Sequence, residues 1–556
     1  MYNKNLELID NAALKRRLSK ISPHDSKIGI TYCVTPTNDY VLLKNELPAD
    51  DLQNPREAVV KMLNTNIKNE MRPNDIIITF GIGLGYLLDE AFNRYPARIF
   101  IYEPDINLLH FVLSNVDFSE HLASGRIFVT NDLDELISRL SSVYLTKDRV
   151  EIAYLPNYAI TKNRELLLMT QKVFDACKSK MVDVNTIIRF SKIWLSNTIE
   201  NIARINEKEA FLLSDLEDKL QGQTALIAGA GPSLNDNIDN IKANRDKFTI
   251  FAVNKAVQYL ISKDIIPDFV VCLDAGNMNR TLDSILNHAD KISIIADIRA
   301  DETLINKGFK KVLYNFSETD FFIKKLAKYN DFMKFYESGG SASTLALTSA
   351  IKMGFSKVVL AGIDLAFKDN IIYSYGERMN RLSQEEMLVD GIKKNIVKVK
   401  SVNGGFVHTR DDYEAFIQHF ETLIREFNYS EIYNISSFGA LINGVKNTNF
   451  NNLELNTQKQ LMYLDNIKPF RIELEQFLKE EFYHINNIIS MLSKGVFSPD
   501  LISATIKSVL IYQYMQADIL TVLQRNFDNE LAQKYIDNTK LAIKTIIEQL
   551  QRNRLI

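Results

Sequence analysis

The segment TALIAGAGPSL, residues 224–234, constrains the fold more than any other part of the sequence. Its apolar first half, Thr224 to Ala228, predicts a buried strand, and the amphipathic stretch 234–241 predicts a helix. The turn between them consists of five small residues: Gly229, Ala230, Gly231, Pro232 and Ser233. A strand, a glycine turn and a helix in this order bring backbone N–H groups and the positive end of a helix to a phosphate. The segment therefore predicts an α/β domain with a phosphate-binding turn.

The residue types in this turn suit nucleotide binding. We expect Gly229 and Gly231 to let the backbone approach a ligand without an intervening side chain. Ser233 is expected to cap the helix and to offer a hydroxyl. The turn has neither the spacing of the dinucleotide-binding fingerprint nor the lysine of a P-loop, so a purely structural turn is the alternative.

Polar residues follow three further apolar runs, and one more small-residue turn precedes a helix. The run 250–253 ends at Asn254, the run 269–273 at Asp274, and the run 358–361 at Gly362, Ile363 and Asp364. Open α/β sheets bind ligands at the carboxyl ends of their strands. Ordinary turn and cap chemistry is the alternative for Asn254 and Asp274. The turn before the predicted helix 345–353 contributes Ser338, Gly339, Gly340 and Ser341 to the same expected cleft.

Together these motifs resemble the motility-associated factor (Maf) glycosyltransferases of flagellated bacteria. The resemblance is carried by GAGPSL, VN at 253–254, CLDAG at 272–276, SGGSAST at 338–344 and LAGIDLAF at 360–367. It covers nearly the whole chain and is strongest over 224–444. It implies an MptE-like domain, shared with archaeal hydroxymethylpterin pyrophosphokinases. It also implies transfer of a nonulosonic acid, of the pseudaminic or legionaminic kind, from its CMP form to Ser or Thr of flagellin, in the service of flagellar assembly and motility.

A more distant similarity is to the bacterial CMP-sialic acid sialyltransferases. Their glycine–Pro–Ser loop matches the turn 229–233, and their nucleotide-contacting asparagine matches Asn254. Their next asparagine falls on Asp274, their Ser–Gly turn on 338–339, and their Gly–Ile–Asp run on 362–364. The similarity thus implies a CMP-binding site built from the same turns.

The similarity also bears on catalysis. One tyrosine that steadies the leaving phosphate in the sialyltransferases falls at Ala366 or Phe367 and is lost here, whereas a second matches Tyr373. Their catalytic histidine falls on His408. Histidine has a suitable pKa for taking the acceptor's proton, and Asp364 and Asp274 are the alternative bases. The donor's phosphate gains charge as it leaves, so fixed hydrogen-bond donors around it are expected to stabilise the transition state.

Composition fits a large enzyme of a reducing compartment. The chain has 556 residues and a net charge of −3, so nothing indicates nucleic-acid binding. Its three cysteines are far apart, and no apolar run approaches the ~20 residues of a membrane span. The charged N-terminal segment lacks the apolar core of a signal peptide. A cytoplasmic location is expected, without a certain cofactor beyond the CMP-sugar donor; a divalent metal is possible but not indicated.

The chain is expected to divide into four parts. A Rossmann-like N-terminal domain covers 1–160, a helical connector 161–215, a central sialyltransferase-like α/β domain 216–450, and a C-terminal helical bundle 451–556. In the first part, the turn 81–85, GIGLG, follows an apolar strand, and Glu103 follows the next strand. This pattern resembles the S-adenosylmethionine methyltransferase loop, but no catalytic motif of a methyltransferase follows. We expect a retained fold with a structural or partner role.

Two other functions are compatible with the sequence. The shared central domain allows a pyrophosphokinase acting on a pterin-like alcohol, for which Asp274 and Asp364 would hold Mg²⁺. A protein that binds flagellin or a nucleotide sugar without catalysis is the third class. Large domains on both sides of the centre favour the glycosyltransferase, because a small-molecule kinase does not need them.

Overall fold

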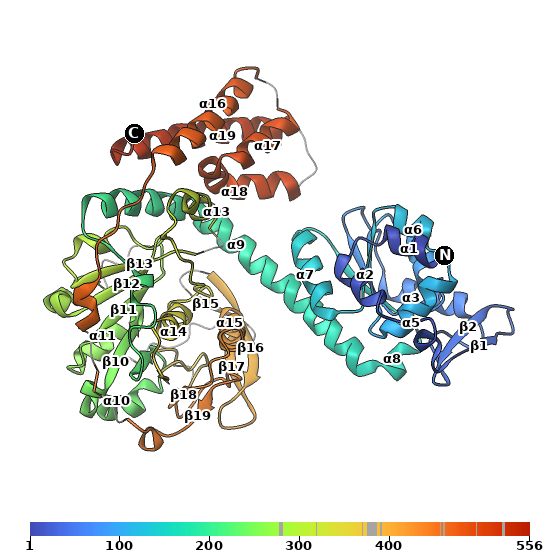
Figure 1. Ribbon diagram of the computed structural model, residues 1–556, viewed down its shortest axis with the longest axis horizontal. Coiled ribbons are helices and arrows are strands. Elements are labelled where there is room, and N and C mark those ends of the chain that lie inside the picture. Colours follow the sequence, from blue (N-terminus) through green and yellow to red (C-terminus); the bar gives the residue numbers. More distant parts are fainter. Residues whose placement is uncertain are drawn as a thin grey trace. The chain divides into compact units, whose positions relative to one another are not determined.

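The structure is a computed structural model that describes residues 1–276, 282–317, 320–369, 371–374, 386–389, 392–455, 458–459, 462–495, 497–524 and 529–556 (Figure 1). It has two compact units, Met1–Thr186 and Ile187–Ile556, and the division falls within the long helix α9, Asn163–Glu207. No helix in the described ranges is both long enough and apolar enough to cross a membrane. The two units are described separately.

The N-terminal unit is built on a parallel sheet of four strands in the order β6-β5-β4-β7. The chain runs from β4 to β5 and β6 on one side and returns to place β7 on the other side of β4, as in a Rossmann-type fold. The strands are β4 (Ile76–Phe80), β5 (Arg98–Tyr102), β6 (Ile127–Thr130) and β7 (Val150–Tyr154). A separate antiparallel sheet contains β1 (Ile30–Val34), β2 (Tyr40–Lys44) and β3 (Leu47–Pro48).

Helices surround the four-stranded sheet and share one hydrophobic core with it. They are α1 (Tyr2–Leu8), α2 (Ala12–Leu18), α3 (Pro55–Asn66), α4 (Tyr86–Arg94), α5 (Ile106–Asn115), α6 (Ser119–Ala123), α7 (Leu133–Val143) and α8 (Tyr158–Thr161).

The second unit is built on a sheet of nine described strands in the order β19-β18-β14-β9-β10-β11-β12-β13-β8, and every neighbouring pair is parallel. The strands are β8 (Phe211–Leu212), β9 (Thr224–Ala228), β10 (Phe248–Val253), β11 (Phe269–Cys272), β12 (Ser293–Asp297), β13 (Lys311–Asn315), β14 (Lys357–Ala361), β18 (Ile432–Asn434) and β19 (Lys446–Asn447). Their residues are almost all buried, which explains why the strands read as continuous apolar runs. The predicted α/β class with parallel sheets is confirmed.

Strand order reverses direction at the middle of this sheet. From β9 the chain adds β10, β11, β12 and β13 on one side, and it then places β14 on the opposite side of β9. The carboxyl ends of β9 and β14 therefore mark the topological switch point of the sheet, where α/β sheets characteristically bind ligands.

Two helical layers cover the sheet. One hydrophobic cluster joins one face to α10 (Leu234–Ala243) and α11 (Asn254–Ser262), and another joins the other face to α14 (Ala342–Lys352) and α15 (Asp411–Phe427). An antiparallel sheet of β15 (Glu386–Val389), β16 (Ile392–Lys400) and β17 (Phe406–Arg410) precedes α15.

The C-terminal segment is helical, as the sequence predicts. Its helices are α16 (Glu475–Leu492), α17 (Pro499–Lys507), α18 (Val509–Gln524) and α19 (Asn529–Arg552). They share the hydrophobic cluster of α10 and α11, and they contact α13 (Phe321–Leu326). The ion pair between Lys325 and the buried Glu481, 2.7 Å, links α13 to α16. These helices thus belong to the same compact unit as the central sheet.

Candidate active site

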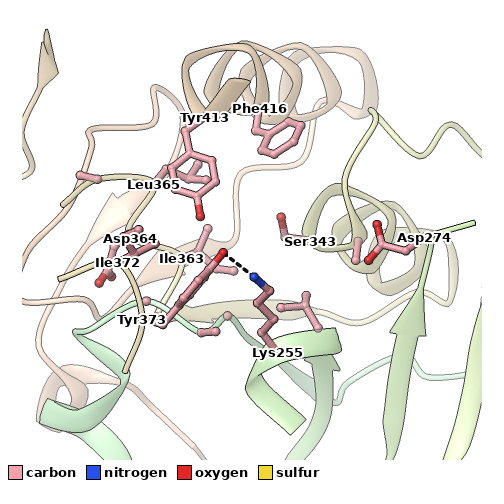
Figure 2. A pocket seen from close by; sticks show the side chains of 17 residues that line it. Lys255, Asp274, Ser343, Ile363, Asp364, Leu365, Ile372, Tyr373, Tyr413 and Phe416 are labelled. Carbon is pink, nitrogen blue, oxygen red and sulfur yellow. Dashed lines mark hydrogen bonds between the residues drawn. The ribbon is translucent and has the colours of Figure 1, made fainter. Parts of the chain in front are cut away.

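A cavity of about 200 Å³ lies at the reversal point of the central sheet (Figure 2). It is bordered by the turn after β9, the segment after β14, the starts of α11 and α14, and one face of α15. Its lining residues are Gly229, Ala230, Gly231, Val253, Lys255, Asp274, Ala342, Ser343, Gly362, Ile363, Asp364, Leu365, Ala366, Ile372, Tyr373, Tyr413 and Phe416.

The glycines of the turn after β9 are required by contact with β14. The amides of Gly229 and Gly231 donate to the carbonyls of Ala361 and Gly362, both at 2.8 Å. A Cβ on Gly231 would lie 2.6 Å from Oδ2 of Asp364 and 2.7 Å from the carbonyl of Gly362. These two amides are thus engaged by the protein's own backbone, and both glycines line the cavity.

Ser233 and Asp364 fasten the same turn from the side. The Ser233 amide donates to Oδ2 of Asp364 at 2.8 Å, and the Ser233 hydroxyl donates to Oδ1. Ser233 occupies the N-cap position of α10 but makes no side-chain cap, so the expected cap is wrong, and the residue is fully buried. Burial raises the pKa of Asp364 to about 6, against the lowering effect of Ser233. Neither Pro232 nor Ser233 lines the cavity.

Lys255 brings a positive charge to the cavity from the first turn of α11. Its Nζ donates to the hydroxyl of Tyr373 at 3.0 Å and lies 4.3 Å from the centre of that ring (Figure 2). Tyr373, which the sequence predicts at the ligand site, lines the cavity and has Lys255 as a cationic partner. Asn254 is the first residue of α11, and its side chain lies outside the described part of the chain.

Tyr413 supports Tyr373 from α15. Figure 2 shows the two hydroxyls directed toward each other, and they interact electrostatically. Arg410 lies over the Tyr413 ring, 3.8 Å from its centre, and its Nε donates to Asp412 at 2.6 Å. Burial raises the pKa of Tyr413 well above its ordinary value, so its hydroxyl stays protonated at neutral pH.

The second small-residue turn precedes α14 as predicted, but the residues that reach the cavity lie in the first turn of the helix and not in the turn before it. Ser341 caps the helix by accepting from the Thr344 amide at 3.1 Å, and Thr344 completes a capping box. Ala342 and Ser343 line the cavity, whereas the predicted Ser338, Gly339, Gly340 and Ser341 do not.

The three predicted bases occupy different environments. Asp274 is exposed and lines the cavity, whereas Asp364 is buried and bound to Ser233. His408 is exposed on β17, opposite Lys398, and is not among the lining residues. The structure therefore does not bring His408 into the site. In the described ranges, no three His, Cys, Asp or Glu side chains form a cluster that could hold a metal ion.

The N-terminal glycine turn, residues 81–85, faces the protein's own side chains. A Cβ on Gly81 would meet Leu155 and Tyr158, one on Gly83 would meet Asp50, and one on Gly85 would meet Phe118, each within 2.8 Å. Because these side chains pack directly against the turn, this turn belongs to the core of the unit.

Glu103, the predicted ribose ligand, is likewise engaged inside the unit. It is fully buried and accepts from the Ile82 amide at 3.2 Å and from the Tyr158 hydroxyl at 3.1 Å. Its other oxygen accepts from Asp105 N and pairs with Lys162 at 3.4 Å. The arrangement fits the expected structural role.

Sequence reasoning missed Lys255, Ser343 and Tyr413. A signal for Lys255 was present: it lies in the first turn of a helix, where the helix dipole disfavours a cation. A cation at such a position is a candidate functional charge. Tyr413 follows a predicted strand in DDYEAF, and its pattern does not separate it from core aromatics.

Comparison with known proteins connects both units to known folds. A family model described as 6-hydroxymethylpterin diphosphokinase MptE-like matches residues 196–370. An uncharacterized protein of Treponema pallidum (strain Nichols) is 32% identical over 100 residues, which are 18% of this chain and 45% of that relative. A solved structure, the Maf glycosyltransferase from Magnetospirillum magneticum AMB-1, has a TM-score of 0.64 at 16% identity, covering 100% of this chain and 96% of that one.

These findings concern fold and family resemblance. The match to the Treponema pallidum protein spans less than half of that relative, and the similarity to the sialyltransferases stays a prediction. The chain has the fold of the Maf glycosyltransferase and carries an MptE-like domain at residues 196–370, which confirms the resemblance predicted from its motifs.

Proposed function

We propose that this protein is a glycosyltransferase that moves a nonulosonic acid of the pseudaminic or legionaminic kind from CMP to Ser or Thr of flagellin. One observation carries the proposal. In a chain with the Maf glycosyltransferase fold, the reversal point of the central sheet holds a cavity that combines Lys255, Ser343 and Tyr373 with one exposed carboxylate, Asp274.

The reaction assigns distinct tasks to these groups. The bond between the sugar's anomeric carbon and the CMP phosphate oxygen breaks, and its electron pair leaves on CMP. The acceptor hydroxyl bonds to the same carbon and loses its proton. Asp274 is proposed as the base that takes this proton, because it lines the cavity and is exposed. Lys255 and Ser343, which also line the cavity, are the proposed hydrogen-bond donors that stabilise the phosphate as its charge grows.

Asp364 has a structural task in this proposal. Its two oxygens accept from the backbone and the hydroxyl of Ser233, so it holds the turn after β9 against the segment after β14. That turn borders the cavity, and its position therefore depends on a carboxylate that itself takes no part in proton transfer.

The MptE-like match makes diphosphate transfer to a pterin-like alcohol the second candidate. Such a kinase binds ATP with Mg²⁺, which requires carboxylate oxygens directed at the phosphates. Asp274 and Asp364 are the acids of the cavity, and Asp364 already accepts two hydrogen bonds from Ser233. This observation favours the glycosyltransferase. A non-catalytic binder of flagellin or of a nucleotide sugar is the third candidate.

The test is incubation of the protein with flagellin and CMP-pseudaminic or CMP-legionaminic acid, followed by intact mass and by measurement of released CMP. We expect flagellin to gain one or more sugar residues, with one CMP released per sugar. A Gly231→Ala variant serves as the control for the site. Unchanged flagellin mass, together with AMP release from ATP and a hydroxymethylpterin, contradicts the proposal and supports the kinase. Binding of CMP-sugar without turnover supports the non-catalytic class.

A further inference from the structure

Among the residues that the structure describes, no acid forms an ion pair with Lys255. Its ammonium donates a hydrogen bond to the Tyr373 hydroxyl. An ammonium has three N–H donors, and the described residues accept from one of them. The residue is exposed, so the remaining donors are open to the cavity that it lines.

The place of Lys255 in its helix is unfavourable without a ligand. It is the second residue of α11, where the helix dipole is positive and disfavours a cation. A bound anion removes this cost and gains from both the ammonium and the helix terminus.

Neighbouring aromatic residues hold the ammonium in position. Tyr373 contacts it through both the hydroxyl and the ring face. Tyr413 lies beside Tyr373, and the Arg410 guanidinium lies over Tyr413 at 3.8 Å from its ring centre. These contacts restrict the lysine side chain before a ligand binds, so it loses less conformational entropy on binding.

A second donor group faces the same space. Figure 2 shows the Ser343 hydroxyl and the Lys255 ammonium directed into the cavity from different elements. Ser343 lies in the first turn of α14, which has 11 residues, so another positive helix terminus borders the cavity beside Lys255.

We propose that Lys255 is the specificity-determining residue of the site, binding an anionic oxygen of the donor, with Tyr373 and Tyr413 as its positioning residues. The inference rests on the proposed function and adds the charge by which the site selects its donor. The anionic oxygen belongs either to the CMP phosphate or to the carboxylate of the nonulosonic acid. Both sources have the same chemistry, and the probes below distinguish them.

The experiment measures binding by calorimetry with the full chain and three probes: cytidine, CMP and CMP-N-acetylneuraminic acid. The variant Lys255→Met keeps a long unbranched side chain and removes the ammonium that lies over the Tyr373 ring. Lys263→Met is the matched control, because Lys263 lies at the end of the same helix, over the Tyr259 ring at 5.5 Å, and does not line the cavity.

We expect Lys255→Met to weaken CMP-N-acetylneuraminic acid about 10–100-fold, as for a charge-assisted contact, and to leave cytidine unchanged. Equal weakening of CMP assigns the anionic oxygen to the phosphate, and unchanged CMP assigns it to the carboxylate. Tyr373→Phe is expected to weaken binding of the same probes about 3–10-fold, because the hydrogen bond from Lys255 to the Tyr373 hydroxyl is lost. Lys263→Met is expected to match the wild type.

Unchanged affinity of Lys255→Met for both anionic probes overturns the inference, provided thermal unfolding shows the variant folded. If the wild type binds neither CMP probe, the proposed function fails, and inorganic diphosphate is then the probe. Diphosphate binding that depends on Lys255 preserves the anion-recognition role without the glycosyltransferase. Diphosphate binding that does not depend on Lys255, or no binding at all, overturns it.

Discussion

The two glycine turns of this protein share a sequence pattern and differ in what they face. Each follows a buried strand at the reversal point of a parallel sheet, β4 in the first unit and β9 in the second. The turn 81–85 packs against side chains of its own unit, whereas the turn 229–233 borders a cavity. A glycine turn therefore does not by itself define a nucleotide site.

The neighbouring strand decides the difference. The residues after β7 include Leu155 and Tyr158, whose side chains fill the space over the N-terminal turn. The residue after β14 is Gly362, with φ of +66°, and it approaches the central turn through backbone alone. Side chains of Ile363 and Asp364 also pack against the central turn, yet a cavity remains beside it, whereas Leu155 and Tyr158 cover the N-terminal turn. Four predictions break or sharpen this comparison, from the largest expected effect to the smallest.

The largest effect on turnover is expected from replacing Asp274 in the central cavity, and little effect from replacing Glu103 in the N-terminal unit. Asp274→Asn removes the proposed base and should lower glycosyl transfer about 10²–10⁴-fold, the usual contribution of a positioned base. Glu103→Gln in the N-terminal unit should leave turnover within about threefold and lower the melting temperature, because it disturbs buried hydrogen bonds and the contact with Lys162. Turnover with flagellin and CMP-sugar provides the measurement.

His408 gives the control for this assignment. It is exposed and outside the cavity, so His408→Asn should keep near-normal turnover. A His408→Asn variant as inactive as Asp274→Asn would return the base to His408.

The second prediction compares one added methyl group in each turn. Gly231→Ala places a Cβ 2.6 Å from Asp364 and 2.7 Å from the Gly362 carbonyl, so the turn must shift. We expect at least a tenfold loss of CMP affinity and about 1–3 kcal/mol of destabilisation. Gly85→Ala meets Phe118 at 2.6 Å with φ of +96° and should destabilise similarly. Its CMP affinity should equal that of the wild type, and a matching loss would contradict the separation of the two turns.

The third prediction concerns the buried carboxylate of the N-terminal turn. Asp50 is fully buried, and burial raises its pKa to about 7, although the Leu84 amide opposes the shift. The folded state therefore keeps a proton that the unfolded state loses near pH 4, and the free energy of unfolding falls as pH rises from about 4 to about 7. Asp50→Asn removes this loss, so the variant should gain about 1–3 kcal/mol over the wild type at pH 8 and little at pH 4.

Melting temperatures of the wild type and Asp50→Asn, measured across this pH range, check the prediction. The difference should grow with pH and level off above pH 7. A constant difference would show that Asp50 is already ionised in the folded protein near pH 5.

The smallest effect is an absence of binding. Because Tyr158, Leu155 and Asp50 contact the N-terminal turn, S-adenosylmethionine should show no saturable binding by calorimetry. Saturable micromolar binding of this cofactor, together with methylated flagellin, would give the N-terminal unit a catalytic role.

Much of the fold follows from the sequence because buried parallel strands are uninterrupted apolar runs. The predicted runs coincide with β9, β10, β11 and β14 within two residues at each end. Strands β12 and β13 escape the pattern, since polar residues at their ends, Ser293, Asp297, Lys311 and Asn315, shorten the apolar run.

The location of the site could be predicted from the sequence, but the side chains that line it could not all be predicted. Strand ends and small-residue turns locate it, because they meet at one edge of the sheet. The direction of each side chain depends on partners far away in sequence: Ser233 turns to Asp364, which lies 131 residues later. Tyr413 reaches the cavity from α15, and His408 is exposed on β17 and does not line it, which the packing of β17 and α15 determines.

Hydrogen–deuterium exchange with and without CMP tests the central claim most directly. The claim is that the donor binds at the central turn and that the N-terminal turn is closed by its own unit. We predict slower amide exchange on CMP addition at 229–231, 253–256, 342–344 and 362–373, with 370 left aside, and no change at 81–85. Protection at 81–85, with none around the central cavity, would contradict the account.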